Sequence, residues 1–455
     1  MIDTASRRSR AHPAGLYFIA AAQGAWYFSR YSTQAILVLY LAHVVYTAPA
    51  EAAFPGVNVL RHLLSWEAQT SNPQALASTT IGLLALCMIP TQILGGFLSD
   101  RYLGRRRGAL TGLVFLTLAP VFWSFGTSFI LALPCFVLGL SLAVNLFAQV
   151  GDLYSDDDPR RPDAYQLMSL VQEAAVIIGP TFCGWLAARY GWHYGFAAAG
   201  SVMLTGTVIY FLGWRHLPSP TATSPQAGGR VSAGTQVRAY LLHTMLRIGG
   251  RIALLIPMLA MIFVCNEQIY DTYLIWGEQH YDRHLFGWVF PASWLMSLDA
   301  GVSFITQIMA IAFWRFYTKR RGAPSEWGQI VSFGVLGLLA PLVLAYASVL
   351  HTGYGQIGMP WGLIFHFIND LAMATIMPIS LALFIRMAPD SAKSMAAAAY
   401  ALVGRLADIM AGQIGQNLPG WGSTRFWLLH TAIMAAGVAL LIIARPLYAA
   451  KREIS

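Results

Sequence analysis

Ionisable side chains lie within long apolar stretches of this chain. On insertion scales a charged side chain inside a membrane span costs about 2.5 to 3.5 kcal/mol, so such groups normally face a cavity or a partner. They are the acids Glu173, Glu267, Asp271, Asp299, Asp370 and Asp408, the bases Arg30 and Arg405, and the neutral His366. With so few bases beside them, several acids must be protonated, hydrated or bound to a cation. This excess of acids favours a carrier that is coupled to protons or to another cation.

Helical spacing groups several polar residues of the first apolar stretch. Gln23, Arg30 and Gln34 are seven and four residues apart, which places them on one face with Tyr27 and Tyr31 nearby. We expect this face to line a cavity and Arg30 to bind substrate. The alternative is that Arg30 forms a purely structural ion pair.

Two acids of a later stretch are one helical turn apart. Glu267 is the strongest single site candidate, with Asp271 on the following turn. The alternative for Glu267 is a structural hydrogen bond between helices. Asp271 and Asp370 have another alternative, in which they lie near water or cap a broken helix.

Another polar stripe lies near the C-terminal end of the chain. His366, Asn369 and Asp370 recur at helical spacing, and Arg405 and Asp408 are neighbours three residues apart that could neutralise each other. His366 and Asp370 supply two metal ligands, which do not close a site. We therefore predict no metal and no cofactor.

The sequence shows no motif of a nucleotide-binding loop and no nucleophilic triad, so we do not expect an enzyme.

Composition places these groups in a membrane protein. Of the 455 residues, 56% are hydrophobic and 11% are charged, whereas soluble domains carry about 25% charged residues. An apolar run of about 20 residues can cross a bilayer as a helix. The runs fall at 15–43, 76–99, 107–125, 127–150, 164–188, 194–214, 251–278, 291–317, 326–350, 358–387, 393–417 and 426–447. We predict an all-α membrane protein with about twelve spans.

The positions of the basic residues that give the net charge of +9 are explained by membrane topology rather than by nucleic-acid binding. Basic residues gather in alternate connections, as at 7–10, 101–107, 160–161, 319–321 and 451–452, and are few in the intervening ones. By the positive-inside rule both termini are cytoplasmic. The basic start leads directly into a full-length span, so we expect no cleavable signal.

A Pro-, Ser-, Thr- and Gly-rich piece at 217–236 divides the spans into two sets of six. We therefore expect an N-terminal half at 1–214, a cytoplasmic linker at 215–250 and a C-terminal half at 251–455. The connection at about 44–75 is the longest external loop, and its 57–66 portion has the pattern of a short surface helix.

The loop between the second and third spans carries a motif. Residues 95–107 read GGFLSDRYLGRRR, which resembles the loop signature of the major facilitator superfamily. The resemblance implies a transporter that works by alternating access, with substrate between two six-helix halves. It also implies a cytoplasmic gate that includes Asp100, Arg101 and Arg105. The alternative is a basic loop that only sets topology.

Further blocks resemble the proton-dependent oligopeptide transporter family. They are AILVLYL at 35–41, GDLY at 151–154 with DPRR at 158–161, CGWL at 183–186 with YGWHYGF at 190–196, EQ at 267–268, and PASW at 291–294. This resemblance implies a bacterial inner-membrane symporter for peptides, with a small-molecule substrate, protons and membrane lipid as partners. We expect a monomer. Bacterial members typically carry two extra helices between the halves, for which this linker is too short.

The chain departs from the family where the family carries its chemistry. The proton motif of the first helix is replaced by QGAWYF at 23–28, and the peptide-binding Arg by Gln34. Ile89, Ala143 and Met373 stand where the family has a Tyr, a Lys and a Glu. Glu173 and Asp299 replace asparagines. Since the charges that would hold a peptide's termini are mostly missing, we do not expect ordinary di- and tripeptide uptake.

These observations together predict a secondary transporter of a peptide-like or zwitterionic organic solute, coupled to protons through non-standard acids. The open alternatives are an exporter of a peptide-like secondary metabolite and a non-transporting membrane sensor or scaffold. Candidate substrate-binding residues are Arg30, Tyr31, Gln34, Asn145, Glu173, Glu267, Trp294, Asp299 and Asn369. Candidate proton-coupling residues are Glu267, Glu173, Asp299 and Asp370.

Overall fold

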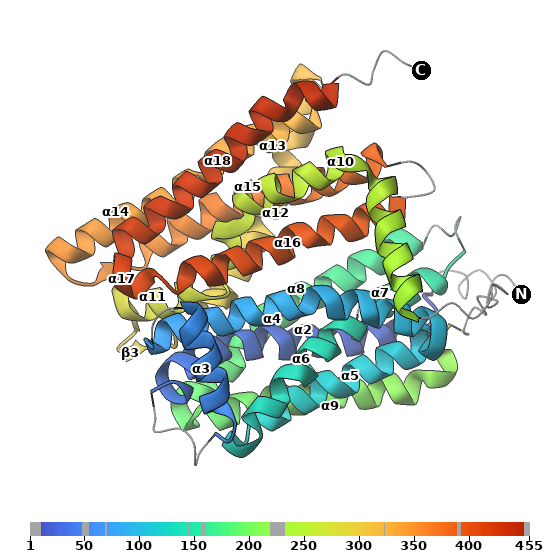
Figure 1. The fold of residues 1–455 in the computed structure, drawn as a ribbon, viewed down its shortest axis with the longest axis horizontal. Helices are drawn as coiled ribbons and strands as arrows, with labels where there is room; N and C mark the ends of the chain where they lie inside the picture. Colours follow the sequence, from blue (N-terminus) through green and yellow to red (C-terminus); the bar gives the residue numbers. More distant parts are fainter. Residues whose placement is uncertain are drawn as a thin grey trace, which may run out of the picture. The chain divides into compact units, whose positions relative to one another are not determined.

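A computed structural model describes residues 11–47, 54–68, 71–143, 145–155, 158, 160–218, 233–322, 324–388 and 393–449. Almost all regular structure in these ranges is helical (Figure 1). The N-terminal helices are α2 (Ala14–Tyr40), α3 (Val57–Ala68), α4 (Pro73–Leu98), α5 (Gly104–Trp123), α6 (Phe129–Ala143), α7 (Asn145–Asp152), α8 (Arg161–Tyr190) and α9 (Trp192–Leu212). The later helices are α10 (Ala233–Gln268), α11 (Thr272–His280), α12 (Trp294–Arg321), α13 (Glu326–Gly337), α14 (Leu339–Tyr354), α15 (Pro360–Met387), α16 (Lys393–Gly415), α17 (Leu418–Trp421) and α18 (Ser423–Ala449).

Short helical turns and strands complete the structure. The turns are η1 (Leu41–Val45), η2 (Ser99–Leu103), η3 (Gly126–Ser128) and η4 (Gly213–His216). The strands are β1 (Tyr281–Asp282), β2 (His284–Leu285), β3 (Trp288–Val289) and β4 (Ile357–Gly358), with β1 parallel to β4 and β2 antiparallel to β3. Phe286 and Gly287 both have positive φ, at 49° and 83°, as a tight hairpin turn requires.

The predicted all-α membrane fold is confirmed. Within the described ranges, nine helical segments are long and apolar enough to cross a membrane. The other three predicted spans are also helical, as α2, α5 and α16. Charged residues interrupt the apolar sequence of these helices, for example Arg30 on α2 and Arg405 on α16.

The stretch predicted as one span over 251–278 is broken in the structure. α10 ends at Gln268 and α11 begins at Thr272. Between them, the amides of Tyr270 and Asp271 bond back three residues to the carbonyls of Glu267 and Gln268, at 3.2 and 3.1 Å. Asp271 then leaves helical geometry, with φ −132° and ψ −117°. Interrupted helices of this kind form the binding sites of many secondary transporters.

The chain divides into two compact units that differ from the predicted halves. Unit 1 comprises residues 1–40, 48–59 and 87–229, and unit 2 comprises 41–47, 60–86 and 230–455. The first part of α4 therefore belongs with the C-terminal helices. The predicted linker at 215–250 is also shorter in the structure, because η4 continues to His216 and α10 begins at Ala233.

Unit 1 is built on the packing of α2 against α8 and α9, and of α5 against α6 and α9 (Figure 1). Its apolar centre includes the fully buried Trp123, Phe129 and Phe196. α8 has a proline in its first turn and is followed directly by Gly191, which has a φ of 112°. Such a proline start and glycine stop are typical of helix boundaries.

In unit 2, α10 packs against α16 and α18, and α15 packs against α12, α13 and α14. The packing of α15 on α12 and of α10 on α16 brings together the acids that the sequence distributes over four spans. An aromatic cluster of Tyr273, Trp276, Phe365 and Trp427 lies beside them, with all four side chains fully buried.

Candidate functional site

The break between α10 and α11 carries a buried acid. Asp271 is 2% exposed, and its Oδ2 accepts a hydrogen bond of 2.5 Å from Ser78 Oγ on α4. Thr272 Oγ1 donates to Ser78 Oγ at 3.1 Å. Asp271 is the N-cap residue of α11. Capping of a broken helix was one of the alternatives expected for this residue. It is buried rather than near water, and it links α11 to α4 within unit 2.

Glu267 belongs to a cluster of two carboxyl groups and one guanidinium. It lies on α10 within hydrogen-bonding contact of the Asp408 carboxyl and within electrostatic range of Arg405, both on α16. Arg405 Nη1 is 2.8 Å from Asp408 Oδ2. The predicted pairing of Arg405 with Asp408 is therefore present, but it includes a third member. One cation faces two acids, so full ionisation leaves a net negative charge.

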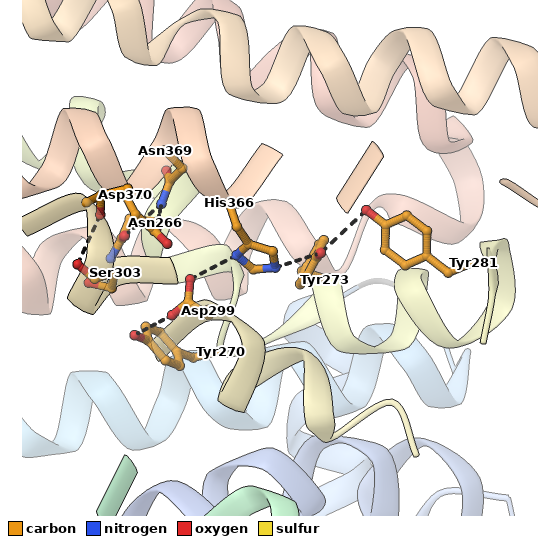
Figure 2. A network of polar contacts seen from close by, with 10 residues as sticks. Asn266, Tyr270, Tyr273, Tyr281, Asp299, Ser303, His366, Asn369 and Asp370 are labelled. Carbon is orange, nitrogen blue, oxygen red and sulfur yellow. Dashed lines mark hydrogen bonds and ion pairs between the residues drawn. The ribbon is translucent and has the colours of Figure 1, made fainter. Parts of the chain in front are cut away.

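A second cluster lies between α12 and α15 (Figure 2). Asp299 Oδ1 is 2.9 Å from His366 Nδ1, and Asp299 Oδ2 accepts a bond of 3.4 Å from Tyr270. His366 Nε2 is 2.9 Å from the hydroxyl of Tyr273, which in turn donates to Tyr281 at 3.4 Å. His366 is fully buried and Asp299 is 6% exposed. The imidazole is therefore held at both nitrogens, away from water.

Asn369 and Asp370 extend this cluster along α15. Asn369 Nδ2 donates to Asp370 Oδ1 and to Asn266 Oδ1, both at 3.0 Å. The Asp370 carboxyl is also in hydrogen-bonding contact with that of Asp299. Possible ligand atoms of Asp299, His366 and Asp370 lie within 4.8 Å of one another. Asp299 thus joins His366 and Asp370, which we judged from the sequence to be too few to close a metal site.

In unit 1, the candidate residues of α2 gather around Tyr27. Its ring stacks on that of Tyr31 at 5.9 Å, and the Arg30 guanidinium lies 5.2 Å from the centre of the Tyr31 ring. Tyr27 is also within electrostatic range of Arg30 and of Glu173 on α8. Arg30 and Glu173 are both half-buried. The α2–α8 packing thus brings an acid and a base near one tyrosine.

The expectation that Gln23 shares a cavity wall with Arg30 and Gln34 is wrong for Gln23. Its side chain is fully buried and donates to the carbonyl of Met168 on α8 at 3.2 Å. Gln34 is half-buried on α2. Helical spacing groups residues on a face but does not determine which end of that face a neighbouring helix covers.

Asn145 is the first residue of α7 and is buried. Its Nδ2 donates to Ser99 Oγ at 2.9 Å and to the carbonyl of Leu142 at 2.7 Å. The amide therefore connects η2 to the end of α6.

Trp294 is the first residue of α12, and its side chain packs on the rings of Trp288 and Phe290.

The proposed gate is described in part. η2 contains the backbone of Asp100 and Arg101, whose side chains lie outside the described residues. Arg105 Nη1 donates to both carboxylate oxygens of Asp152, at 2.7 and 2.8 Å. Asp152 belongs to the GDLY block, so two motifs that the sequence separates meet here within unit 1.

Several members of these clusters carry little signal in the sequence. Tyr273 and Tyr281 resemble the many other aromatic residues of the spans, and Ser78 is one of several small polar residues on α4. His366 was visible as a titratable residue in an apolar stretch. Only the packing of α12 on α15 shows that it contacts Asp299.

Comparisons with known proteins agree with this architecture. The family model described as Major Facilitator Superfamily matches residues 19–412. "Peptide transporter YePEPT" of Yersinia enterocolitica is 23% identical over 92% of this chain and 89% of its own length. The "Di-/tripeptide transporter" of Lactococcus lactis is 22% identical over 92% of this chain and 93% of its own length.

Solved structures show the same fold at low sequence identity. A peptide transporter POT variant in complex with alafosfalin has a TM-score of 0.76 and 19% identity over 98% of both chains. The POT family transporter PepTSo has a TM-score of 0.78 and 13% identity over 97% of this chain and 99% of that one. The chain therefore belongs to the Major Facilitator Superfamily, and the proteins that it resembles along nearly its whole length are peptide transporters.

Proposed function

We propose that this transporter moves a peptide-like or zwitterionic organic solute and couples its movement to protons through Glu267. The observation that carries the proposal is the contact between the carboxyl groups of Glu267 and Asp408, which share Arg405. The coupling acid is thus placed on α10 rather than in the first helix, where the family motif is replaced by QGAWYF.

Two neighbouring carboxylates resist simultaneous ionisation, because each disfavours the charge of the other. Arg405 can neutralise one of them. The Arg405 and Asp408 side chains are 21% and 16% exposed, so water screens the remaining charge only in part. A proton on Glu267 completes the charge balance, and its departure leaves one negative charge. This cluster can therefore alternate between two charge states, as a proton-coupled carrier requires.

The solute class is supported by the residues and by the relatives. One solved POT family structure is in complex with 5-aminolevulinic acid, a zwitterion, and another POT structure holds alafosfalin. This chain keeps one cation on α2, Arg30, although it lacks the family's charges at Gln34, Ala143 and Met373. We assign Arg30 to the carboxylate of the solute, and expect Arg30→Ala to weaken binding.

The experiment uses the full chain in proteoliposomes, with 5-aminolevulinic acid and alafosfalin as probes. Wild type should concentrate at least one probe when the lumen is more alkaline than the outside. Glu267→Gln should abolish this accumulation but retain counterflow exchange, because the amide keeps its shape without exchanging a proton. Glu278→Gln is the matched control. Glu278 lies near the end of α11 and pairs with His43, and it is not a member of the Glu267 cluster.

The results separate the parts of the proposal. If Glu267→Gln concentrates a probe as well as wild type does, Glu267 is not the coupling acid. If wild type takes up neither probe nor shows thermal stabilisation by either, the proposed solute class is wrong.

A further inference from the structure

We propose that the break between α10 and α11 binds one Na⁺ ion, held by Asp271, Ser78, Thr272 and the carbonyl oxygen of Gly412. This ion is distinct from the proton that we assign to Glu267. The acid at the break, Asp271, is buried where α4, α11 and α16 meet within unit 2.

Oxygen atoms from three segments of unit 2 meet at this acid. Ser78 Oγ on α4 lies 2.5 Å from Asp271 Oδ2 and 3.1 Å from the carbonyl oxygen of Gly412 on α16. Thr272 Oγ1, at the start of α11, lies 3.1 Å from Ser78 Oγ. Oxygen atoms that bind one small cation at about 2.0 to 2.6 Å are themselves about 3 to 3.5 Å apart when they are neighbours. The two spacings of 3.1 Å therefore suit neighbouring ligands of one ion.

The carboxyl group of Asp271 offers a further ligand atom. Its side chain is 2% exposed, and the hydroxyl and amide of Thr272 approach the carboxyl group. Among the residues that the structure describes, however, Oδ1 has no hydrogen-bond partner. A proton shared between Oδ2 and Ser78 would leave Oδ1 as it is. Because a buried carboxylate oxygen without a partner is costly, a cation at Oδ1 stabilises the break.

The backbone at the break also favours a bound cation. The C-terminal end of a helix carries partial negative charge, and α10 ends at Gln268, just before the acid. Asp271 itself caps α11, whose N-terminal end favours negative charge at that position. Unwound carbonyls and the C-terminal ends of half-helices coordinate coupling cations in many secondary transporters. The break thus combines a carboxylate with the negative end of α10.

The charge of the ligand set indicates a monovalent ion. Hydroxyl, carbonyl and carboxylate oxygens are ligands of hard cations, and Ca²⁺ sites usually contain several carboxylates. This set contains one carboxylate, that of Asp271. Asp408 lies within electrostatic range of it, but Asp408 pairs with Arg405. One negative charge at the break is therefore matched by one positive charge.

The close packing of α16 indicates a small ion. A Cβ atom at Gly415, the last residue of α16, would clash with Ser78 Oγ and Thr272 Oγ1 and would lie 3.0 Å from Asp271 Oδ2. The ligands therefore converge where only a glycine leaves them space, which favours Na⁺ over the larger K⁺. Gln413, two residues earlier on α16, is exposed, so the site lies close to the surface of the unit.

The test measures binding of radioactive Na⁺ to the purified full chain, and thermal unfolding in NaCl, KCl or choline chloride at one ionic strength. Wild type should bind Na⁺ saturably, and NaCl should raise its melting temperature more than the other two salts do. Asp271→Asn and Ser78→Ala should lose both effects, because each removes a ligand. Ser348→Ala is the matched control, since Ser348 is also buried but donates to the carbonyl of Leu344 on α14.

Gly415→Ala tests the geometry of the site without removing a ligand or a charge. Its Cβ atom must displace the hydroxyls of Ser78 and Thr272, so the affinity for Na⁺ should fall. Gly404→Ala should keep the affinity of wild type, because a Cβ atom there meets nothing within 4 Å. The unfolding transition of each variant shows whether it folds, and a folded Gly415→Ala or Ser78→Ala decides the question if Asp271→Asn does not fold.

The outcomes separate this site from the proposed function. A wild type that binds no Na⁺, or that NaCl and choline chloride stabilise equally, overturns the cation site, and equal stabilisation by NaCl and KCl overturns the choice of Na⁺. If folded Asp271→Asn keeps the Na⁺ effect, the ligands are wrong. If Glu267→Gln still concentrates solute while Na⁺ binding depends on Asp271, only the assignment of Glu267 fails. If Glu267→Gln loses proton-driven accumulation and wild type binds no Na⁺, only the cation site fails.

Discussion

Substitution of Gly412 by alanine tests how closely α4 and α16 pack within unit 2. A Cβ atom at Gly412 would lie 2.6 Å from the Cα and 2.9 Å from the backbone nitrogen of Gly82, and 3.1 Å from the carbonyl oxygen of Ser78. All three contacts are to backbone atoms, so rotation of a side chain cannot relieve them. The two helices must move apart.

Such overpacking typically costs about 1 to 3 kcal/mol of stability. Alanine also gains about 1 kcal/mol over glycine in a helix interior, so the net loss for Gly412→Ala is about 0 to 2 kcal/mol. Gly404→Ala on the same helix is the matched control, since a Cβ there meets nothing within 4 Å. The two variants should differ by about 1 to 3 kcal/mol.

The free energy of unfolding can be measured by titration with denaturant, followed by tryptophan fluorescence. Gly82→Ala should be the milder change at the same crossing, because its nearest contact is 3.2 Å from the Gly412 Cα. Equal stability of Gly412→Ala and Gly404→Ala would refute the close crossing. It would also remove the basis for the Ser78–Asp271 contact, which depends on the same approach.

Three further predictions concern the gate, the solute and pH. Asp100→Ala and Arg105→Gln should reduce turnover more than stability, because the exposed Arg105–Asp152 pair is worth about 0.2 to 1 kcal/mol; exchange at the wild-type rate would contradict this. Dialanine should give little thermal stabilisation, and a tight, saturable shift would mean that the missing charges at Gln34 and Met373 matter less than we infer. The hydrogen bonds from Arg160 lower the pKa of Asp158 from 3.8 to about 2, so its contribution to stability is complete above the unfolded pKa and is lost only as the pH falls toward 2. The change in melting temperature on Asp158→Asn should therefore be the same at every pH used for transport, and a change that varies with pH in that range would count against the Asp158–Arg160 pair.

Much of the fold could be predicted because it depends on local properties of the chain. The apolar runs locate the spans, since a helix is the way for such a run to satisfy its backbone hydrogen bonds in lipid. Each of the twelve predicted runs contains helix in the structure. The interruption at 269–271 was not foreseen, because the surrounding hydropathy continues through it without a change.

The candidate site was predicted only as a set of residues. Glu267, Asp299 and Asp370 stood out because ionisable groups inside apolar runs are costly and need partners. Their partners could not be assigned, since Asp408 is far from Glu267 in the sequence and His366 is far from Asp299. For Gln23 the sequence suggested a position on a cavity wall, whereas in the structure this polar side chain is buried against α8.

The amino-acid sequence by itself determined the class of protein, the helical spans and the departures from the family's motif residues. These follow from composition, from spacing along one helix and from residue identity, which are local. The tertiary structure alone decided that Glu267 meets Asp408, that His366 lies between Asp299 and Tyr273, and that Ser78 bonds to Asp271. Each of these contacts joins different helices, and the packing of one helix on another depends on the shapes of both surfaces rather than on the period of either sequence.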